Sequence, residues 1–340
     1  MTISPSDRLV IGGWLADKEG AGYYRLRLPL DELEQRGHSV VYHPVLPWRP
    51  GKRPASHVLV AQRISNRLPS RRWLDAAGDV RRVFEVDDDL FNCDPASARA
   101  RRYYLRPEVR ERFLANIRSA DVVTSSTPYL AGVLRDEYKV QAPIHVLPNC
   151  VHPSVLDLPA VDQSAPLSIG WWGSDTHRGD FEGLRRPLGR FLRRRNDVHL
   201  VMGGADFSPL LNREAEFRPW RSIWNDPCAY MAGLDTQVGL APLWNTQFNR
   251  CKSPLKALEY AARGIVVVAS DVEPYRRFVR HGVTGFLVKH DHEWADALEA
   301  LLGDEQLRIR MAAAARAQAA EWTIDRHAHL WERAYRGGNA

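Results

Sequence analysis

Short apolar runs alternate with longer amphipathic stretches through the first half of the chain. Each apolar run has the length of a buried strand, and the amphipathic stretches repeat apolar positions at helical spacing. The expected strands are Arg8–Trp14, Ser39–His43, Ser56–Ala61, Arg81–Val86, Asp121–Thr124 and Ile144–Leu147. The expected helices between them are Tyr24–Gly37, Glu108–Ser119 and Pro128–Glu137. Strands that alternate with helices favour a parallel sheet covered by helices on both faces.

The same pattern begins again after a proline-bearing segment, Pro148–Pro166, whose composition is typical of a linker. The second set of expected strands is Leu167–Trp172, Val198–Met202, Asp235–Ala241 and Ile265–Ala269. The second set of expected helices is Asp180–Arg195, Pro254–Arg263, Glu293–Leu302, Glu305–Glu321 and about Asp325–Arg336. The pattern therefore predicts an α/β protein with two doubly wound, Rossmann-like domains and a ligand between the carboxyl ends of their sheets.

Composition fits this division and narrows the class of protein. A chain of 340 residues is long for one core and suits two domains of roughly 150 residues each. The longest uninterrupted apolar run, near Ile265–Ala269, is far too short to span a bilayer. The first residues lack the charged and apolar regions of a signal peptide, and the four cysteines have no metal-binding or redox spacing. We therefore expect a cytoplasmic enzyme.

The basic charge of the chain comes almost entirely from arginine. The net charge is +6, and only six of the 47 basic residues are lysines. Arginines cluster at 71–72, at 99 with 101–102, at 185–186 and at 193–195. Such clusters suit a nucleic acid or an anionic membrane surface, but no nucleic-acid motif accompanies them, and solvated helix faces are the plainer interpretation.

Two of the six lysines stand where a helix is expected to begin, which is an unfavourable place for a cation. Ser253 and Pro254 suit the N-cap and the first helical residue, with Lys252 just before them and Lys256 in the first turn. Each cation costs about 0.3–1 kcal/mol at the positive end of the helix dipole. An anion on the free amide groups, closed in by both lysines, would compensate. Glu259 shares a helix face with Lys256, so this pattern indicates a nucleotide sugar; the alternative is a solvated helix face with incidental lysines.

The segment Glu259–Val268 resembles the donor site of the GT-B glycosyltransferases, specifically the glycogen-synthase-like retaining family 4. Its residues follow a Glu-Ala-hydrophobic-Ala-x-Gly-x-Pro-Val-Val pattern, with Val266 in place of the proline. In that family the glutamate, here Glu259, binds the donor ribose. A second glutamate eight residues earlier normally touches the donor sugar, and this chain has Cys251 there. The resemblance thus implies that diphosphate and ribose binding are kept while the sugar contacts differ.

The resemblance also implies an architecture and an activity. Residues 1–152 would form an acceptor-side domain, 153–166 a linker, 167–321 a donor domain, and 322–340 a helix that packs back on the first domain. The implied enzyme is a hexosyltransferase that uses a nucleoside-diphosphate-sugar, retains configuration and needs no metal or other cofactor. Its acceptor would be a glycan, a lipid-linked saccharide, a protein or, less expectedly, a nucleic acid, and peripheral contact with the inner membrane face is compatible with this. The alternatives are a non-catalytic nucleotide-sugar-binding protein, favoured by Cys251, and an epimerase-type GT-B enzyme.

Three consecutive carboxylates, Asp87, Asp88 and Asp89, follow an expected strand at the edge facing the second domain. An Asp-x-Asp pattern holds a metal in GT-A enzymes, but the second Rossmann-like half argues against that fold. We expect one of the three to contact the acceptor or act as a general base, because crowding raises the pKa of at least one carboxyl. A helix N-cap or a solvated turn is the alternative.

Glycines crowd the turn between the first strand and the first helix. Gly13 follows the strand, and Gly20 and Gly22 precede the helix, so their amides are free to meet a ligand. The resemblance implies that this loop faces the acceptor and the donor phosphates, with Arg25 positioning an anionic group. A purely structural turn is as well supported for any single glycine.

The corresponding loop of the second half follows the strand 167–172. Gly173, Ser174 and Arg178 occupy the positions that the family uses near the diphosphate, and Thr176 and His177 are weaker candidates. An arginine there would bind phosphate oxygens through two parallel hydrogen bonds.

The donor site is completed by the loop 244–250 and the start of the lysine-bearing helix. Asn249 is expected to contact sugar hydroxyls, and Pro254 and Leu255 to present backbone to the donor. These positions come from the resemblance rather than from spacing.

Overall fold

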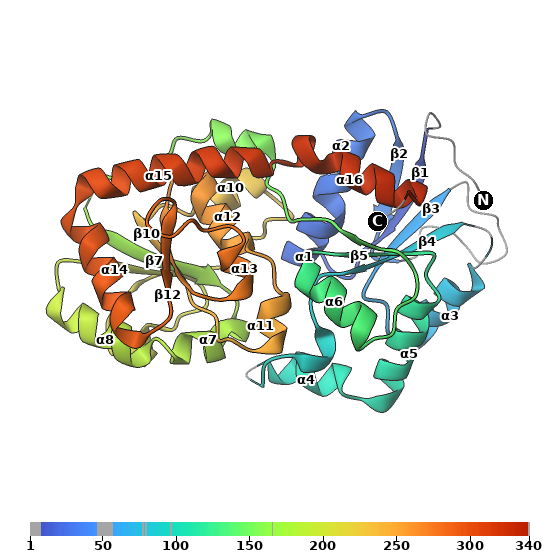
Figure 1. Cartoon of the computed structure of the whole chain (residues 1–340), viewed down its shortest axis with the longest axis horizontal. Helices are drawn as coiled ribbons and strands as arrows, with labels where there is room; N and C mark the ends of the chain where they lie inside the picture. Colours follow the sequence, from blue (N-terminus) through green and yellow to red (C-terminus); the bar gives the residue numbers. More distant parts are fainter. Residues whose placement is uncertain are drawn as a thin grey trace.

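The computed structural model describes residues 8–45, 57–76, 78, 80–95, 97–164 and 166–338. Their framework is two six-stranded sheets (Figure 1). The first sheet has the order β2-β1-β3-β4-β5-β6, and every neighbouring pair is parallel. Its strands are β1 (Val10–Trp14), β2 (Ser39–His43), β3 (Val58–Gln62), β4 (Arg81–Val86), β5 (Val122–Ser125) and β6 (Ile144–Val146). The expected strands of this half are therefore present; Ser56, the expected start of β3, lies outside the described residues.

The second sheet is also parallel throughout and has the order β12-β11-β10-β7-β8-β9. Its strands are β7 (Ser168–Gly173), β8 (His199–Gly204), β9 (Glu216–Arg218), β10 (Val238–Ala241), β11 (Val266–Ser270) and β12 (Gly285–Val288). The sequence missed β9 and β12. Both are short edge strands. β9 is mostly polar and has no apolar run, and the apolar run of β12, Gly-Phe-Leu-Val, is only four residues long. The two sheets confirm the predicted doubly wound α/β class.

The helices of the first half cover both faces of its sheet. They are α1 (Gly20–Gly22), the π-helical η1 (Tyr23–Arg27), α2 (Leu28–Gln35), α3 (Arg67–Asp75), η2 (Leu90–Asn92), α4 (Ala98–Tyr104), α5 (Pro107–Arg118), α6 (Pro128–Asp136) and η3 (Pro153–Asp157). The expected first helix thus begins earlier, at Gly20, and passes through a π-helical turn that often marks a functional site. The sequence did not predict α3 and α4.

The helices of the second half follow its strands in the same way. They are η4 (Asp175–His177), α7 (Arg178–Glu182), α8 (Arg185–Arg194), α9 (Ser208–Leu211), α10 (Pro227–Ala232), α11 (Gln247–Cys251), α12 (Leu255–Ala262), α13 (Glu273–Arg276), α14 (Asp291–Gly303), α15 (Glu305–Ala319), η5 (Ala320–Trp322) and α16 (Ile324–Arg336). One expected helix, 180–195, is divided into α7 and α8, and the expected loop 244–250 contains most of α11. Across the described residues, no helix combines the length and apolar character needed to cross a membrane.

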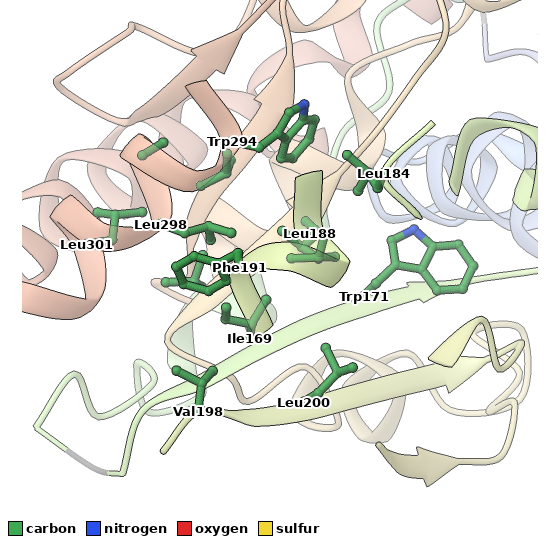
Figure 2. Close-up of a cluster of buried hydrophobic side chains, with 14 of the residues drawn as sticks. Ile169, Trp171, Leu184, Leu188, Phe191, Val198, Leu200, Trp294, Leu298 and Leu301 are labelled. Atoms are coloured by element: carbon green, nitrogen blue, oxygen red, sulfur yellow. The ribbon is translucent and has the colours of Figure 1, made fainter. Parts of the chain in front are cut away.

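The second sheet packs against its helices through a continuous apolar cluster. Figure 2 shows Ile169 of β7 facing Phe191 of α8, with Leu298 of α14 on the other side of the ring. Trp171, further along β7, is also fully buried. This packing holds the carboxyl end of β7 rigid, where the expected donor loop begins.

The last helix, α16, leaves the second half and packs on the first (Figure 1). Val151 and Thr323 form an isolated parallel bridge where the chain crosses back. Ala328 and Trp331 of α16 are fully buried in the same apolar cluster as Leu30 of α2. Helix α16 therefore connects the two halves a second time, besides the chain segment that follows β6.

A buried ion pair joins the first helical turn to the first sheet. Arg25 and Glu85 are 1% and 2% exposed, and Arg25 Nε lies 2.7 Å from Glu85 Oε1. Arg25 Nη1 donates to the Leu147 carbonyl at 2.6 Å and to Asn149 Oδ1 at 2.9 Å. Asn149 in turn donates to Ser253 Oγ at 2.7 Å. One guanidinium therefore links helix, sheet and the loop that enters α12.

We expect Arg25→Met to lower the free energy of unfolding by about 3–5 kcal/mol, because it leaves the Glu85 carboxylate buried without its partner. Denaturant unfolding measures the loss. The double variant Arg25→Met/Glu85→Gln should recover part of it, since no uncompensated charge remains. An equal loss in the single and double variants would contradict this explanation.

Trp331→Ala should cost about 3–5 kcal/mol, because it empties a fully buried site between α16 and the first half. His329→Ala is the matched control, since His329 is exposed on the same helix and should change stability by less than about 0.5 kcal/mol. Thermal unfolding of both variants checks the expectation; a small loss for Trp331→Ala would mean that α16 contributes little to stability.

Candidate active site

The described residues enclose a cavity of about 300 Å³ between the carboxyl ends of the two sheets. The first half contributes the turn after β1 and the residues after β4. The second half contributes the loop after β7 and one face of α12. Of the residues expected from the sequence, those lining the cavity are Gly20, Arg25, Asp87, Asp88, Gly173, Ser174, His177, Lys252, Ser253, Leu255, Lys256 and Glu259.

Glu259 lies on the buried face of α12, and a hydroxyl from the first half holds its carboxylate. The Tyr24 hydroxyl donates to Glu259 Oε1 at 2.6 Å. Burial raises the pKa of Glu259, while the hydrogen bonds from Tyr24 and Tyr230 and the charge of Lys256 act against that rise. Glu259 is thus a buried acceptor for hydroxyl groups, and in this arrangement it is shared across the domain boundary.

Lys256 lies one helical turn before Glu259 on the same wall. Its Nζ donates to the Trp172 carbonyl and lies 5.1 Å from the ring centroid of Trp171. Burial lowers the pKa of Lys256 to about 8; the charge of Lys252 acts in the same direction and that of Glu259 against it. Among the described residues, neither lysine forms an ion pair with a carboxylate. Two cations thus face the cavity without a salt-bridge contact among the described residues.

The start of α12 leaves its amide groups free. The helix begins at Leu255 with Pro254 at the N-cap, and no side chain caps it. The expected N-cap, Ser253, instead accepts the hydrogen bond from Asn149, which draws its side chain away from the helix. The uncapped amides lie beside Lys252 and Lys256 and add to the anion-binding character of this wall.

The three aspartates have different surroundings. Asp87 Oδ1 lies 3.5 Å from Arg63 Nη1. Asp88 lines the cavity; burial raises its pKa, and the charge of Lys252 opposes the rise. Asp89 is fully buried away from the cavity and accepts hydrogen bonds from Tyr138, Asn92 and Gln247. Among the described residues no three His, Cys, Asp or Glu side chains gather as metal ligands.

His177 belongs to a hydrogen-bonded pair behind the cavity wall. Its Nδ1 lies 3.0 Å from Asp180 Oδ2. The other oxygen, Asp180 Oδ1, accepts from the Trp244 amide at 3.0 Å and from Asn249 Nδ2 at 2.7 Å. Burial would raise the pKa of Asp180, but these bonds and His177 outweigh it and lower the pKa. The ionised Asp180 therefore accepts a hydrogen bond from Nδ1–H, and Nε2 of His177 is left as a hydrogen-bond acceptor.

His177 stays neutral near physiological pH. Burial, together with the positive charges of Lys252 and Lys256, lowers its pKa to about 4, although Asp180 acts in the opposite direction. A neutral imidazole in a fixed orientation can accept a hydroxyl proton in a hydrogen bond without adding a third cation to the cavity.

Several expected site residues lie elsewhere. Arg178 is exposed and pairs with Glu182 at 3.1 Å, one turn along α7, so it is not placed to bind a diphosphate in this arrangement. Asn249 is 1% exposed and orients Asp180 rather than facing the cavity. Arg25 reaches the cavity edge, but its guanidinium is taken up by Glu85 and the backbone, so it supports the site without a free donor for an anion.

The remaining expected residues have structural surroundings. A Cβ on Gly13 would lie 2.8 Å from Leu30, so this glycine permits close packing of α2 on β1. The Gly22 amide donates to Asp17 at 3.0 Å, and Thr176 and Pro254 do not line the cavity. Cys251 is fully buried in the apolar cluster of the first sheet and so does not occupy a sugar-contacting position.

The sequence missed three kinds of residue in the cavity or directly behind its wall. Tyr24 and Tyr230 reach Glu259 from separate elements, which periodicity does not reveal. Asp180 appeared only as a helical residue, although His177 three positions before it offered a signal. Arg63 lines the cavity, pairs with Asp17 at 2.7 Å and has a φ of 48°. A left-handed arginine is costly and is found where the surroundings demand it.

A second cavity of about 420 Å³ adjoins the first and shares part of its wall. The shared residues are Trp172, Trp220 and Tyr230. The Trp220 and Tyr230 rings lie 6.3 Å apart, and Trp220 is 46% exposed. Polar side chains on its far side are Glu216, Arg218, Arg221 and Asp235. A flat, aromatic ligand group with polar edges suits this second cavity.

Comparison with known proteins places the donor-site segment and the fold. Residues 252–318 match the family model described as glycosyl transferases group 1. A curated relative from Pseudarthrobacter chlorophenolicus, D-inositol 3-phosphate glycosyltransferase, is 48% identical over 73 residues, which is 20% of this chain and 17% of the relative. The chain thus matches about a sixth of that relative's length.

Solved structures match over nearly the whole chain at low identity. Sucrose-phosphate synthase from Thermosynechococcus elongatus has a TM-score of 0.68 and 15% identity, covering 97% of this chain and 98% of the other. Anabaena HepE in complex with UDP and glucose has a TM-score of 0.65 and 12% identity, covering 96% and 99%. The chain therefore has the GT-B fold, and the part of it that carries the lysine pair and Glu259 is similar to the glycosyl transferases of group 1.

Proposed function

We propose that the chain is a glycosyltransferase that moves a sugar from a nucleoside-diphosphate-sugar to an acceptor hydroxyl. The observation that carries this proposal is the cavity wall formed by Lys252, Lys256 and Glu259, where two cations without carboxylate partners lie next to a buried carboxylate. A diphosphate followed by a ribose presents the complementary groups in that order. The wall lies in the segment that matches the group 1 model, and HepE, solved with UDP and glucose, shares the fold.

The donor fits along the second half of the cavity. The diphosphate meets Lys252, Lys256 and the free amides at the start of α12. The ribose hydroxyls donate to Glu259, beside the Tyr24 hydroxyl or in its place. The base enters the adjoining cavity, where Trp220 and Tyr230 offer ring surfaces and polar side chains lie beyond them.

The main requirement of the reaction is that the negative charge on the departing diphosphate is stabilised. The two lysines supply the positive charge that a metal supplies in Asp-x-Asp enzymes, and we propose that transfer is independent of a metal. Each donor aimed at developing charge in a shielded site contributes about 3 kcal/mol, or on the order of a hundredfold in rate.

The acceptor approaches from the first half. Asp88 faces the cavity with a raised pKa and is placed to orient an acceptor hydroxyl, and the neutral His177 offers a second hydrogen-bond acceptor. We propose retention of configuration, in which a donor phosphate oxygen takes the acceptor proton on the face from which the diphosphate leaves. Under inversion, Asp88 would instead take that proton as general base.

Donor binding tests the proposal. Wild-type protein should bind one nucleoside diphosphate out of a UDP, GDP, ADP, CDP and dTDP panel in a thermal-shift and calorimetric titration. Lys256→Ala and Glu259→Gln should each weaken that binding by about ten- to a hundredfold, because each removes a charged hydrogen-bond partner. The exposed Lys289→Ala, in the same half, is the control and should bind as wild type. No binding to any nucleotide, or equal binding by all variants, would refute the donor site.

The same titration should depend on pH in the range where Lys256 loses its proton. Its pKa is lowered to about 8, so the ammonium is present below that pH and is lost as the pH rises through it. Affinity should therefore be level near pH 7 and fall, by at most about tenfold per pH unit, above about pH 8. Lys256→Arg keeps its charge throughout and should give a level profile. The same fall in the arginine variant would assign the titration to another group.

A further inference from the structure

A third cavity, here called the arginine groove, lies between α4 of the first half and η4 of the second. It has a volume of about 760 Å³. From α4 and the residues just after it come Arg99, Arg102, Tyr103 and Arg106, and from η4 come Asp175 and Thr176. Figure 1 shows α4 at the lower edge of the first half, on the side that faces the second half. Nothing in the reaction described above uses these residues.

The backbone explains why the arginines share this groove. Arg99 and Arg102 are three residues apart on α4, so the helical backbone places them on one face, and Arg106 follows α4 as the extended residue that precedes α5. Arg101, which falls between Arg99 and Arg102, donates to the Cys93 carbonyl at 3.3 Å and does not line the groove. The basic cluster seen in the sequence is therefore divided, with one arginine supporting the backbone and three facing a hollow.

The groove carries more positive charge than its surroundings balance. Among the described residues, Arg99 and Arg102 form no hydrogen bond or ion pair, and Arg106 lies against the Tyr103 ring with its Cζ 5.9 Å from the centroid. One carboxylate, Asp175, faces the three guanidinium groups. Arg99 and Arg102 are like charges on one helix face and repel each other, and an anion in the groove would remove that cost.

The groove adjoins the candidate active site across a single turn of η4. Ser174 and His177 line the 300 Å³ cavity of the candidate active site, here called the donor cavity. Asp175 and Thr176, which lie between them in the chain, line the groove. The hydroxyls of Ser174 and Thr176 lie 2.7 Å apart, and Ser97 donates to the Thr176 carbonyl at 3.4 Å. A molecule held in the groove by one end can therefore extend its other end past η4 into the donor cavity.

We propose that the arginine groove binds a phosphate group of the acceptor, so that the enzyme glycosylates phosphate-bearing acceptors. This inference rests on the proposed function, because it assigns the acceptor class for the same active site. Guanidinium forks pair with phosphate oxygens through two parallel hydrogen bonds, which suits arginine rather than lysine here. The arginines line a hollow and do not spread over a flat face. This shape suits a phosphate group that enters the hollow better than it suits the surface of a bilayer.

Binding of glycerol 3-phosphate, with glycerol as the neutral control, tests the groove without requiring turnover. Isothermal titration should detect binding of glycerol 3-phosphate to the wild-type protein and none of glycerol. Arg99→Gln/Arg102→Gln should weaken it by about tenfold or more for each arginine. Arg193→Gln/Arg194→Gln removes the same charge from the exposed end of α8, outside the groove, and should leave binding unchanged.

The variants of the donor wall keep the two proposals separate. Lys256→Ala should leave glycerol 3-phosphate binding intact if the groove holds the anion. Binding lost in Lys256→Ala and kept in Arg99→Gln/Arg102→Gln would place the anion in the donor cavity and overturn the groove, while leaving the donor site in force. An absence of binding to the wild-type protein would overturn the groove too. Groove binding together with failure of every nucleotide would refute the proposed function alone.

Two further experiments determine whether the phosphate belongs to a lipid headgroup or to a soluble acceptor. Flotation with phosphatidylcholine vesicles, with and without phosphatidylglycerol, reports a lipid headgroup if wild-type protein binds the anionic vesicles and the arginine variant does not. Transfer to matched pairs of free sugars and their phosphates reports a soluble acceptor. There the arginine variant should raise the KM for the phosphorylated partner at least tenfold, with kcat and the donor KM unchanged. A preference for the neutral partner in both proteins would overturn the proposal.

Discussion

The arrangement of the two sheets depends on one buried guanidinium. Arg25 binds Glu85 of β4, the carbonyl that follows β6 and the side chain of Asn149, and Asn149 holds Ser253 at the entrance to α12. These partners lie on three segments of the chain, namely β4, the residues after β6 and the entrance to α12, so the network ties the position of α12 to the first sheet. The same network keeps Ser253 away from the helix terminus and thereby leaves its amides open. Arg25, which itself binds no ligand, thus positions the start of α12, where we propose that the diphosphate binds.

The two basic sites differ in burial and in the type of cation. Removal from water lowers the pKa of Lys256 to about 8, so that its charge is easily modulated by a bound anion. The arginines of the groove are exposed, and the guanidinium is in general a permanently charged group. A bound phosphate favours the protonated, charged form of such a lysine. This suits a leaving group that gains negative charge during the reaction. A permanently charged fork suits an acceptor group whose charge stays the same throughout.

The sequence predicted most of the framework because its strands are buried on both faces, and such strands appear as apolar runs. It failed at β9, where Glu216 and Arg218 pair with each other and no apolar run exists. The sequence singled out α12 as the expected donor helix through an electrostatic conflict between Lys252, Lys256 and the helix dipole, which is a local signal. Local rules misplaced Ser253, because a partner from a distant segment competes for its hydroxyl.

Positions inferred from loop order were less informative than positions inferred from chemistry. Arg178 follows β7 at a plausible distance, yet a glutamate one turn along its own helix binds it. The three aspartates are equivalent in sequence, but Asp89 is bound by Tyr138 and Gln247 from separate elements, and only packing distinguishes it from Asp88. The arginine groove could not be predicted from the sequence for the same reason, since its two walls, α4 and η4, lie far apart in the chain.

The hydrogen bond between Tyr24 and Glu259 links donor binding to the arrangement of the two halves. At 2.6 Å it joins a side chain of η1 to the carboxylate expected to receive the ribose. A carboxylate has about four lone-pair sites, so a ribose can share Glu259 with Tyr24 or displace it. Because Tyr24 precedes Arg25, which is bound to the first sheet, displacement would change contacts in the first half as well. A ligand can shift such an equilibrium only by its differential affinity for the two states. The hydroxyl of Tyr24 and the ribose thus meet at one carboxylate, which links donor binding to the position of the first half.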